Sequence, residues 1–192
     1  MIEDAIIESN ISPSKLKQMF DYRLSRLRQS MAKKNISLVI LQNPVSLRYA
    51  IDFDEYQLFQ SHIPTCYLFV PIEGPIVMHG SVRRDFPNVD EYKRPCFISP
   101  FDGGVELKDK AELFCKELKQ FTGEYCQNNQ IGIERMSPEV FNTLRDANFQ
   151  LTDAECILEQ AKKIKCVTEI ECIKNSILVA EHGIKLMHEN SV

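Results

Sequence analysis

The chain has 192 residues, of which 44% are hydrophobic and 26% are charged, a composition typical of one ordinary globular domain with or without an appendage. Its net charge of −4 and its dispersed basic residues argue against nucleic acid and anionic membranes as partners. The acidic start MIEDAIIESN is unlike a signal peptide, and no apolar run approaches the roughly 20 residues that cross a bilayer. We therefore expect a cytoplasmic protein that binds neither nucleic acid nor membrane.

The first half of the chain alternates helical and strand patterns. Ser12 followed by Pro13 is a typical helix start, as is Asn43 followed by Pro44, and the run ISLVILQ is typical of a buried strand. A Glu73–Gly74 turn separates two apolar runs, which indicates a hairpin. The predicted elements are a helix at 12–34, a strand at 36–42, a short helix from Pro44, strands at 66–71 and 74–80, and a strand at 96–100.

The second half contains more helix. The predicted elements are a helix at 107–121, a strand at 130–134, a helix from Ser137 to about 148, a helix at 153–164 and a long helix at 168–189. We interpret Thr152 with Glu155, and Thr168 with Glu171, as capping boxes that start the last two helices. Because strands and helices interleave with short connections, the sequence predicts an α/β domain with a mixed β-sheet flanked by helices on both faces.

The last helix carries an apolar stripe with no segment after it to cover it. The stripe follows the spacing of a buried helix face and consists of Ile170, Ile173, Ile177, Ala180, Ile184 and Met187. Two interpretations are open: the stripe packs on a partner surface, or the helix folds back on its own domain.

No residues form a recognisable catalytic set. The chain has no HExxH motif, no nucleophile elbow and no glycine-rich phosphate loop, and its seven cysteines lack paired ligand spacing. The acidic run DFDE at 52–55 supplies few ligands for a metal ion. We therefore expect no catalytic residue and no metal site in this chain.

One connecting segment has the composition of a ligand-binding loop. Tyr56 and Phe59 lie beside His62, between the predicted short helix and the next strand. These residues either line a ligand mouth or an interface, or pack under the loop as part of the core.

Two separate segments of the chain resemble one known family. DYRLSRLRQSMAKKNISLVILQNPVSLRYAIDF (21–53) resembles the opening of the N-terminal domain of the creatinase, prolidase and Xaa-Pro aminopeptidase family. ILEQAKKIKCVTEIECIKNSILVAEHGI (157–184) resembles the junction that leads into the catalytic "pita-bread" domain of that family. The resemblance implies a ribonuclease H-like N-terminal domain at 1–164. It also implies a linker and the first helix of an absent catalytic domain at 165–192.

One branch of the family is more similar still. LRYAIDFDEYQLFQSHIPTCYLFVPIEGPIVM (47–78) resembles a segment of the dimethylsulfoniopropionate lyase-like members. Phe59 stands where that branch has Trp, and Ile63 where it has Asn. The resemblance implies that Tyr56, Phe59 and His62 face substrate, and the aromatic rings suit a cationic head group through cation–π attraction.

The resemblance also implies a function for the whole protein. Family enzymes hold two divalent metal ions (Mn, Zn, Co or Fe) in the catalytic domain, and the N-terminal domain supports homodimerisation and shapes the active-site entrance. We expect this chain to be the non-catalytic N-terminal domain of a Xaa-Pro aminopeptidase or prolidase type enzyme, with its catalytic domain as partner. The alternatives are the same domain of a lyase-like protein, and a stand-alone dimerising or binding module.

Overall fold

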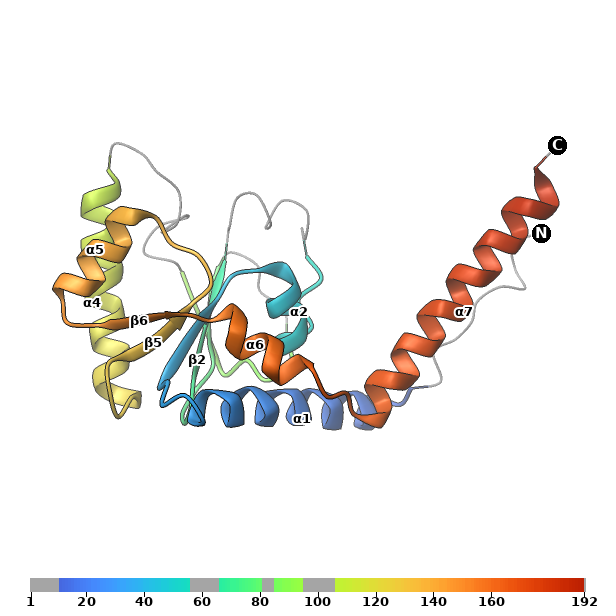
Figure 1. Cartoon of the computed structure of the whole chain (residues 1–192), viewed down its shortest axis with the longest axis horizontal. Helices are drawn as coiled ribbons and strands as arrows, with labels where there is room; N and C mark the ends of the chain where they lie inside the picture. Colours follow the sequence, from blue (N-terminus) through green and yellow to red (C-terminus); the bar gives the residue numbers. More distant parts are fainter. Residues whose placement is uncertain (1–10, 56–65, 81–84, 95–105, 192) are drawn as a thin grey trace.

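The computed structural model describes residues 11–55, 66–80, 85–94 and 106–191, and these form a six-stranded mixed sheet with six helices (Figure 1). The strands are β1 (Leu38–Leu41), β2 (Tyr67–Pro71), β3 (Val77–His79), β4 (Glu91–Lys93), β5 (Gln130–Ile133) and β6 (Gln150–Asp153). Their order across the sheet is β4-β3-β2-β1-β5-β6. Strand β2 runs antiparallel to both neighbours, whereas the other paired strands are parallel. The predicted mixed sheet and hairpin are therefore confirmed.

Helices cover both faces of the sheet, as the sequence predicts. Helices α1 (Pro13–Ala32), α2 (Pro44–Ile51) and α6 (Glu155–Lys162) lie on one face, and α4 (Leu107–Tyr125) and α5 (Pro138–Asp146) lie on the other (Figure 1). Alternate residues of β1 point to opposite faces: Val39 joins the core under α1 and α6, whereas Ile40 joins the core under α4. Both faces of the central strands are buried, which explains the continuous apolar runs in the sequence.

Three predicted helix starts are confirmed by their side-chain caps. The Ser12 hydroxyl accepts a hydrogen bond from Lys15 N at 3.3 Å, and the Asn43 amide oxygen accepts one from Val45 N at 3.0 Å. Ser137 caps α5 in the same way. Proline occupies the first turn in each of these helices, where its missing N–H costs no hydrogen bond.

The two predicted capping boxes are wrong in position. Thr152 lies within β6, where it pairs with Gly132 of β5, so its backbone belongs to the sheet and α6 begins later. The carboxylate of Asp153 accepts the hydrogen bond from Glu155 N at 2.8 Å instead. Thr168 lies inside the last helix, which begins at Val167, and the N-cap is Cys166, two positions before the predicted cap.

Helix α7 (Val167–Asn190) extends away from the rest of the chain (Figure 1). Its predicted apolar stripe is exposed along its length, with 43% of Ile170, 52% of Ile177 and 67% of Met187 accessible to solvent. The interpretation that this helix folds back on its own domain is therefore wrong. Within the described ranges, no helix combines the length and apolar character that crossing a membrane requires.

Candidate functional site

The start of α7 is attached to α1 by a nearly buried ion pair. Arg23 Nε lies 2.9 Å from Glu169 Oε1, and the two side chains are only 16% and 4% exposed. The Arg23 guanidinium also lies over the rings of Phe20 and Tyr49, at 5.2 and 5.3 Å from their centroids. Glu169 is the one residue of α7 that is buried among those described. The first turn of this helix is thus the point at which the domain holds it.

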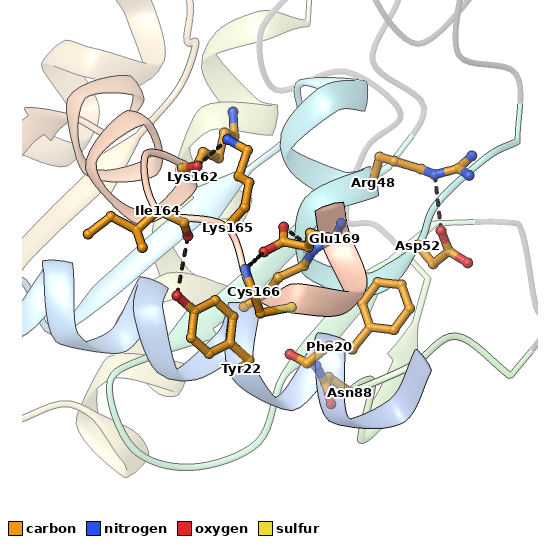
Figure 2. A network of polar contacts seen from close by, with 11 residues as sticks. Phe20, Tyr22, Arg48, Asp52, Asn88, Lys162, Ile164, Lys165, Cys166 and Glu169 are labelled. Carbon is orange, nitrogen blue, oxygen red and sulfur yellow. Dashed lines mark hydrogen bonds and ion pairs between the residues drawn. The ribbon is translucent and has the colours of Figure 1, made fainter. Parts of the chain in front are cut away.

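The same carboxylate determines where α7 begins. Glu169 Oε2 accepts a hydrogen bond from Cys166 N at 2.9 Å, and Cys166 takes the N-cap position (Figure 2). A carboxylate in the first turn also interacts favourably with the positive end of the helix dipole. One side chain therefore both caps α7 and binds it to α1.

Further contacts from α1 hold the segment between α6 and α7. The Tyr22 hydroxyl donates to the carbonyl of Ile164 at 3.3 Å, as Figure 2 shows, and Arg26 donates to the carbonyl of Gln160 at 3.2 Å. Lys15 and Glu171 form a more exposed ion pair at 3.2 Å. Successive positions along α1 thus fix the end of α6, the linker and the first turn of α7, and we call this region the junction.

A cavity of about 240 Å³ lies beside the ion pair of the junction. It is lined by side chains of α1, α2, α6, α7 and the linker: Arg23, Val45, Arg48, Tyr49, Lys162, Lys165, Glu169, Cys172 and Ile173. Burial and the Glu169 carboxylate raise the pKa of Tyr49 well above its usual value, so the phenol remains protonated. The cavity therefore combines several cations with a buried hydrogen-bond donor.

A second polar cluster lies between the sheet and α4. Glu117 accepts a hydrogen bond from the Tyr67 hydroxyl at 3.0 Å, and its other oxygen lies 3.1 Å from His79 Nε2. The His79 ring is 1% exposed and stacks on Tyr67 with centroids 4.6 Å apart. This cluster lies beside a cavity of about 320 Å³. The Glu117 carboxylate pairs the Tyr67 hydroxyl and His79 Nε2 inside the core and joins α4 to the β2–β3 hairpin, whereas His79 Nδ1 has no partner among the described residues.

The residues predicted to face substrate are not placed by the structure. Tyr56, Phe59 and His62 lie outside the described residues, so their position stays a prediction from the resemblance. Of the neighbouring acidic run, Asp52 ends α2 and pairs with Arg48 at 3.0 Å, while Phe53 is buried against Phe86. In the part of the chain that the structure describes, no three His, Cys, Asp or Glu side chains gather to hold a metal ion. The described residues therefore offer no donor set that fits the two-metal site implied by the resemblance.

Sequence reasoning missed both polar clusters. Arg23 and Glu169 are 146 residues apart, and Tyr67 and Glu117 are 50 residues apart, so no local pattern connects them. A usable signal existed for Glu169 alone, because an acidic residue three positions after an N-cap is the pattern of a capping box. It was missed because the N-cap residue is Cys166 rather than serine or threonine.

A family model described as the creatinase/prolidase N-terminal domain matches residues 23–164. Two curated relatives, both named dimethylsulfoniopropionate lyase DddP, are similar over nine tenths of the chain. The protein from Roseovarius nubinhibens is 24% identical over 178 residues, which are 90% of this chain and 40% of that protein. The protein from Roseobacter denitrificans is 21% identical over 180 residues, 91% of this chain and 40% of that protein. The chain thus spans about 40% of the length of these relatives.

Solved structures share the fold at low sequence identity. A Xaa-Pro dipeptidase from Bacillus anthracis has a TM-score of 0.51 and 16% identity, covering 79% of this chain and 38% of that one. A Xaa-Pro aminopeptidase chain from Streptococcus pyogenes has a TM-score of 0.50 and 10% identity, covering 76% of this chain and 98% of that one. The Streptococcus pyogenes chain contains little beyond the matched region, whereas the Bacillus anthracis chain continues well past it.

Proposed function

Because the family model spans most of its length, the chain belongs to the creatinase/prolidase N-terminal domain family, and we propose that it is the non-catalytic N-terminal domain of a larger metal-dependent enzyme. In this proposal, residues 1–164 form the domain, and residues 165–192 form a linker and the first helix of the catalytic domain. Helix α7 is the observation that carries the proposal. It is anchored through one turn and otherwise presents apolar side chains to solvent.

The boundary in this proposal coincides with a change in packing. The family match ends at residue 164, and the N-cap of α7 follows at Cys166. Residues before this point contribute to the two buried cores, whereas most of α7 contributes nothing to them. A following domain that packs on the stripe would remove the exposed surface of Ile177, Ile184 and Met187 from water. These side chains are 52%, 62% and 67% exposed, so each would contribute roughly 1–2 kcal/mol on burial.

The finer role of the domain is proposed from the resemblance to the family. We assign it a part in forming a cytoplasmic homodimer and in shaping the active-site entrance, with Tyr56, Phe59 and His62 facing substrate. The cysteines described by the structure are all free thiols, which is consistent with a reducing compartment. Two divalent metal ions (Mn, Zn, Co or Fe) would be held by the catalytic domain and would supply an activated water or a Lewis acid there.

Two activities compete for the complete enzyme. Hydrolysis of a Xaa-Pro peptide is supported by the named activities of the structural neighbours, which share the fold at 16% identity or less. Cleavage of dimethylsulfoniopropionate is favoured by a different observation: the two curated relatives match 90% and 91% of the chain by sequence. The cationic head group of that compound would suit an aromatic entrance formed by Tyr56 and Phe59.

The test uses the protein encoded by the complete gene. We expect it to bind two divalent ions per chain and to cleave either a Xaa-Pro dipeptide or dimethylsulfoniopropionate, but not both at comparable rates. Phe59→Ala should weaken substrate binding and raise KM several-fold, whereas the exposed Glu112→Ala change on α4 should leave KM unchanged. A gene product that ends after α7 and binds no metal would overturn the proposal in favour of a stand-alone module.

A further inference from the structure

The junction cavity carries a concentrated positive charge. Arg23, Arg48, Lys162 and Lys165 line it together with one carboxylate, that of Glu169, whereas the chain as a whole has a net charge of −4. Glu169 is already paired with Arg23. The positive charge at this cavity is therefore a local feature that the overall composition does not reveal.

Of the three other cations, Arg48 and Lys165 are only weakly engaged by acidic side chains among the described residues. Arg48 pairs with Asp52 at 3.0 Å, but both side chains are exposed, at 51% and 39%. Lys162 lies 3.5 Å from the exposed Glu159 and 3.5 Å from the Ser46 hydroxyl, and it also interacts with the more buried carboxylate of Glu134. Lys165 donates to the carbonyl of Lys162, and among the described residues no carboxylate lies within ion-pair distance of it. An anion entering the cavity would thus meet Arg48, whose ion pair is exposed, and Lys165, which has no carboxylate partner among the described residues.

A buried hydrogen-bond donor lies in the same cavity wall. Tyr49 is 7% exposed, and its hydroxyl has no hydrogen-bond partner in the part of the chain that the structure describes. Its neighbour in the wall, Arg23, is held in place by Glu169 and by the ring of Tyr49 itself. A buried hydroxyl without a partner is unfavourable, so a small side-chain movement that opened it to the cavity would let a ligand oxygen satisfy it.

The rest of the wall is apolar and sets the size of the ligand. Val45 and Ile173 are partly exposed side chains of α2 and α7 that border the cavity, and Cys172 lies beside them. The volume of about 240 Å³ is below the range of roughly 300–1,000 Å³ that is usual for drug-sized ligands. A small ligand with an apolar part next to its charged group would match this lining.

We propose that the junction cavity binds a small organic anion, a carboxylate or a phosphate monoester. Arg48, Lys162 and Lys165 would hold its anionic group, and Val45 and Ile173 would contact its apolar part. Because α7 supplies part of the wall, an occupied cavity would also brace the first turn of this helix against α1 and α2. Contacts within the described chain alone form this site, so its ligand binding does not depend on the proposed enzymatic function.

The test is a titration of the 192-residue chain at low ionic strength, followed by calorimetry and by amide chemical shifts. Phenyl phosphate is the probe, inorganic phosphate tests the anionic group alone, and benzyl alcohol is the neutral analogue. We expect saturable one-site binding of phenyl phosphate, weaker binding of phosphate, and none of benzyl alcohol. The shifts should centre on Arg48, Tyr49 and Lys165.

Matched variants separate this site from general charge attraction. Lys165→Gln and Tyr49→Phe should each weaken binding of phenyl phosphate by about 5–10-fold while leaving the circular dichroism spectrum unchanged. Lys185→Gln, which removes an equal charge from an exposed position on α7, should have no effect. The proposal is overturned by absence of saturation up to about 10 mM probe. Equal weakening by Lys165→Gln and Lys185→Gln, or equal binding of benzyl alcohol, would overturn it as well. None of these failures would affect the proposed function, which rests on α7 and the family match.

Discussion

Arg23 on α1 and Glu169 on α7 form an ion pair at 2.9 Å across 146 residues of sequence, and it anchors a helix that is otherwise exposed. An exposed ion pair contributes little to stability, but this one is nearly buried and its carboxylate also caps the helix. Breaking a buried pair leaves an uncompensated charge, which is costly. The junction is therefore a defined attachment point rather than a chance contact between two surface helices.

Glu169→Gln should loosen the first turn of α7 without unfolding the domain. The glutamine can still accept from Cys166 N, but Arg23 loses its counter-charge in a site that is 16% exposed. We expect the first turn of α7 to lose about 2–4 kcal/mol of local stability. Amide hydrogen exchange at residues 167–172 should accelerate correspondingly, while the core strands keep their protection. Lys15→Gln, which removes the exposed pair with Glu171, should cost less than about 1 kcal/mol. Equal effects of the two variants would contradict the anchoring role.

Cys166→Ser should strengthen the start of α7. Serine is a favoured N-cap residue, and its hydroxyl is a better acceptor for the N3 backbone N–H than the thiol that now occupies the position. We expect a gain of about 0.5–1 kcal/mol in local stability, measured by slower amide exchange in the first turn. Faster exchange in this variant would show that the thiol has a packing role that a hydroxyl cannot replace.

Glu117→Ala should destabilise the whole domain. It would leave both the Tyr67 hydroxyl and His79 Nε2 without the carboxylate that they contact inside the core. Each buried polar group that loses its partner costs about 1–3 kcal/mol, so we expect a loss of roughly 2–5 kcal/mol in denaturant unfolding. Glu112→Ala on the exposed side of the same helix should change stability by less than about 0.5 kcal/mol. A loss below about 1 kcal/mol for Glu117→Ala would contradict a structural role for the cluster.

Gly132→Ala should destabilise the fold because β5 passes close under α6. A Cβ at this position would meet Val39 Cγ1 at 3.1 Å and Ile157 Cδ1 at 3.2 Å. Overpacking of this kind costs about 1–3 kcal/mol. Gly123→Ala in α4 is the matched control, because nothing lies within 4 Å of its added Cβ and alanine favours a helix by up to about 1 kcal/mol. Thermal unfolding of the two variants should shift in opposite directions, and a stabilising Gly132→Ala would show that the Val39 and Ile157 side chains move to admit the added methyl group.

Local chemistry made most of the fold predictable from the sequence. The caps at Ser12, Asn43 and Ser137 depend on neighbouring residues alone, and the strands buried on both faces are continuous apolar runs. Strand β4 was not predicted, because it has only three residues, Glu91–Lys93, of which two are charged, and it pairs with β3 only through tertiary structure. The predicted strand at 96–100 lies outside the described residues.

The two polar clusters could not be predicted from the sequence, because each depends on contacts between distant elements. The junction depends on Arg23 meeting Glu169, and the core cluster depends on His79 meeting Glu117, in both cases through the packing of distant elements. The exposed stripe of α7 was visible in the sequence as a periodic pattern, but periodicity cannot show whether a helix folds back or projects outward. The direction in which α7 projects depends on the contacts that hold its first turn on α1.

The mass and metal content of the natural gene product test the central claim most directly. The matched region is 40% of the curated relatives, so we expect a polypeptide more than twice the 22.2 kDa of this chain. It should carry two divalent metal ions, with two Asp, one His and two Glu in the sequence that follows α7. A natural product of 22.2 kDa without bound metal would contradict the account and would leave the exposed face of α7 as the surface of a stand-alone module.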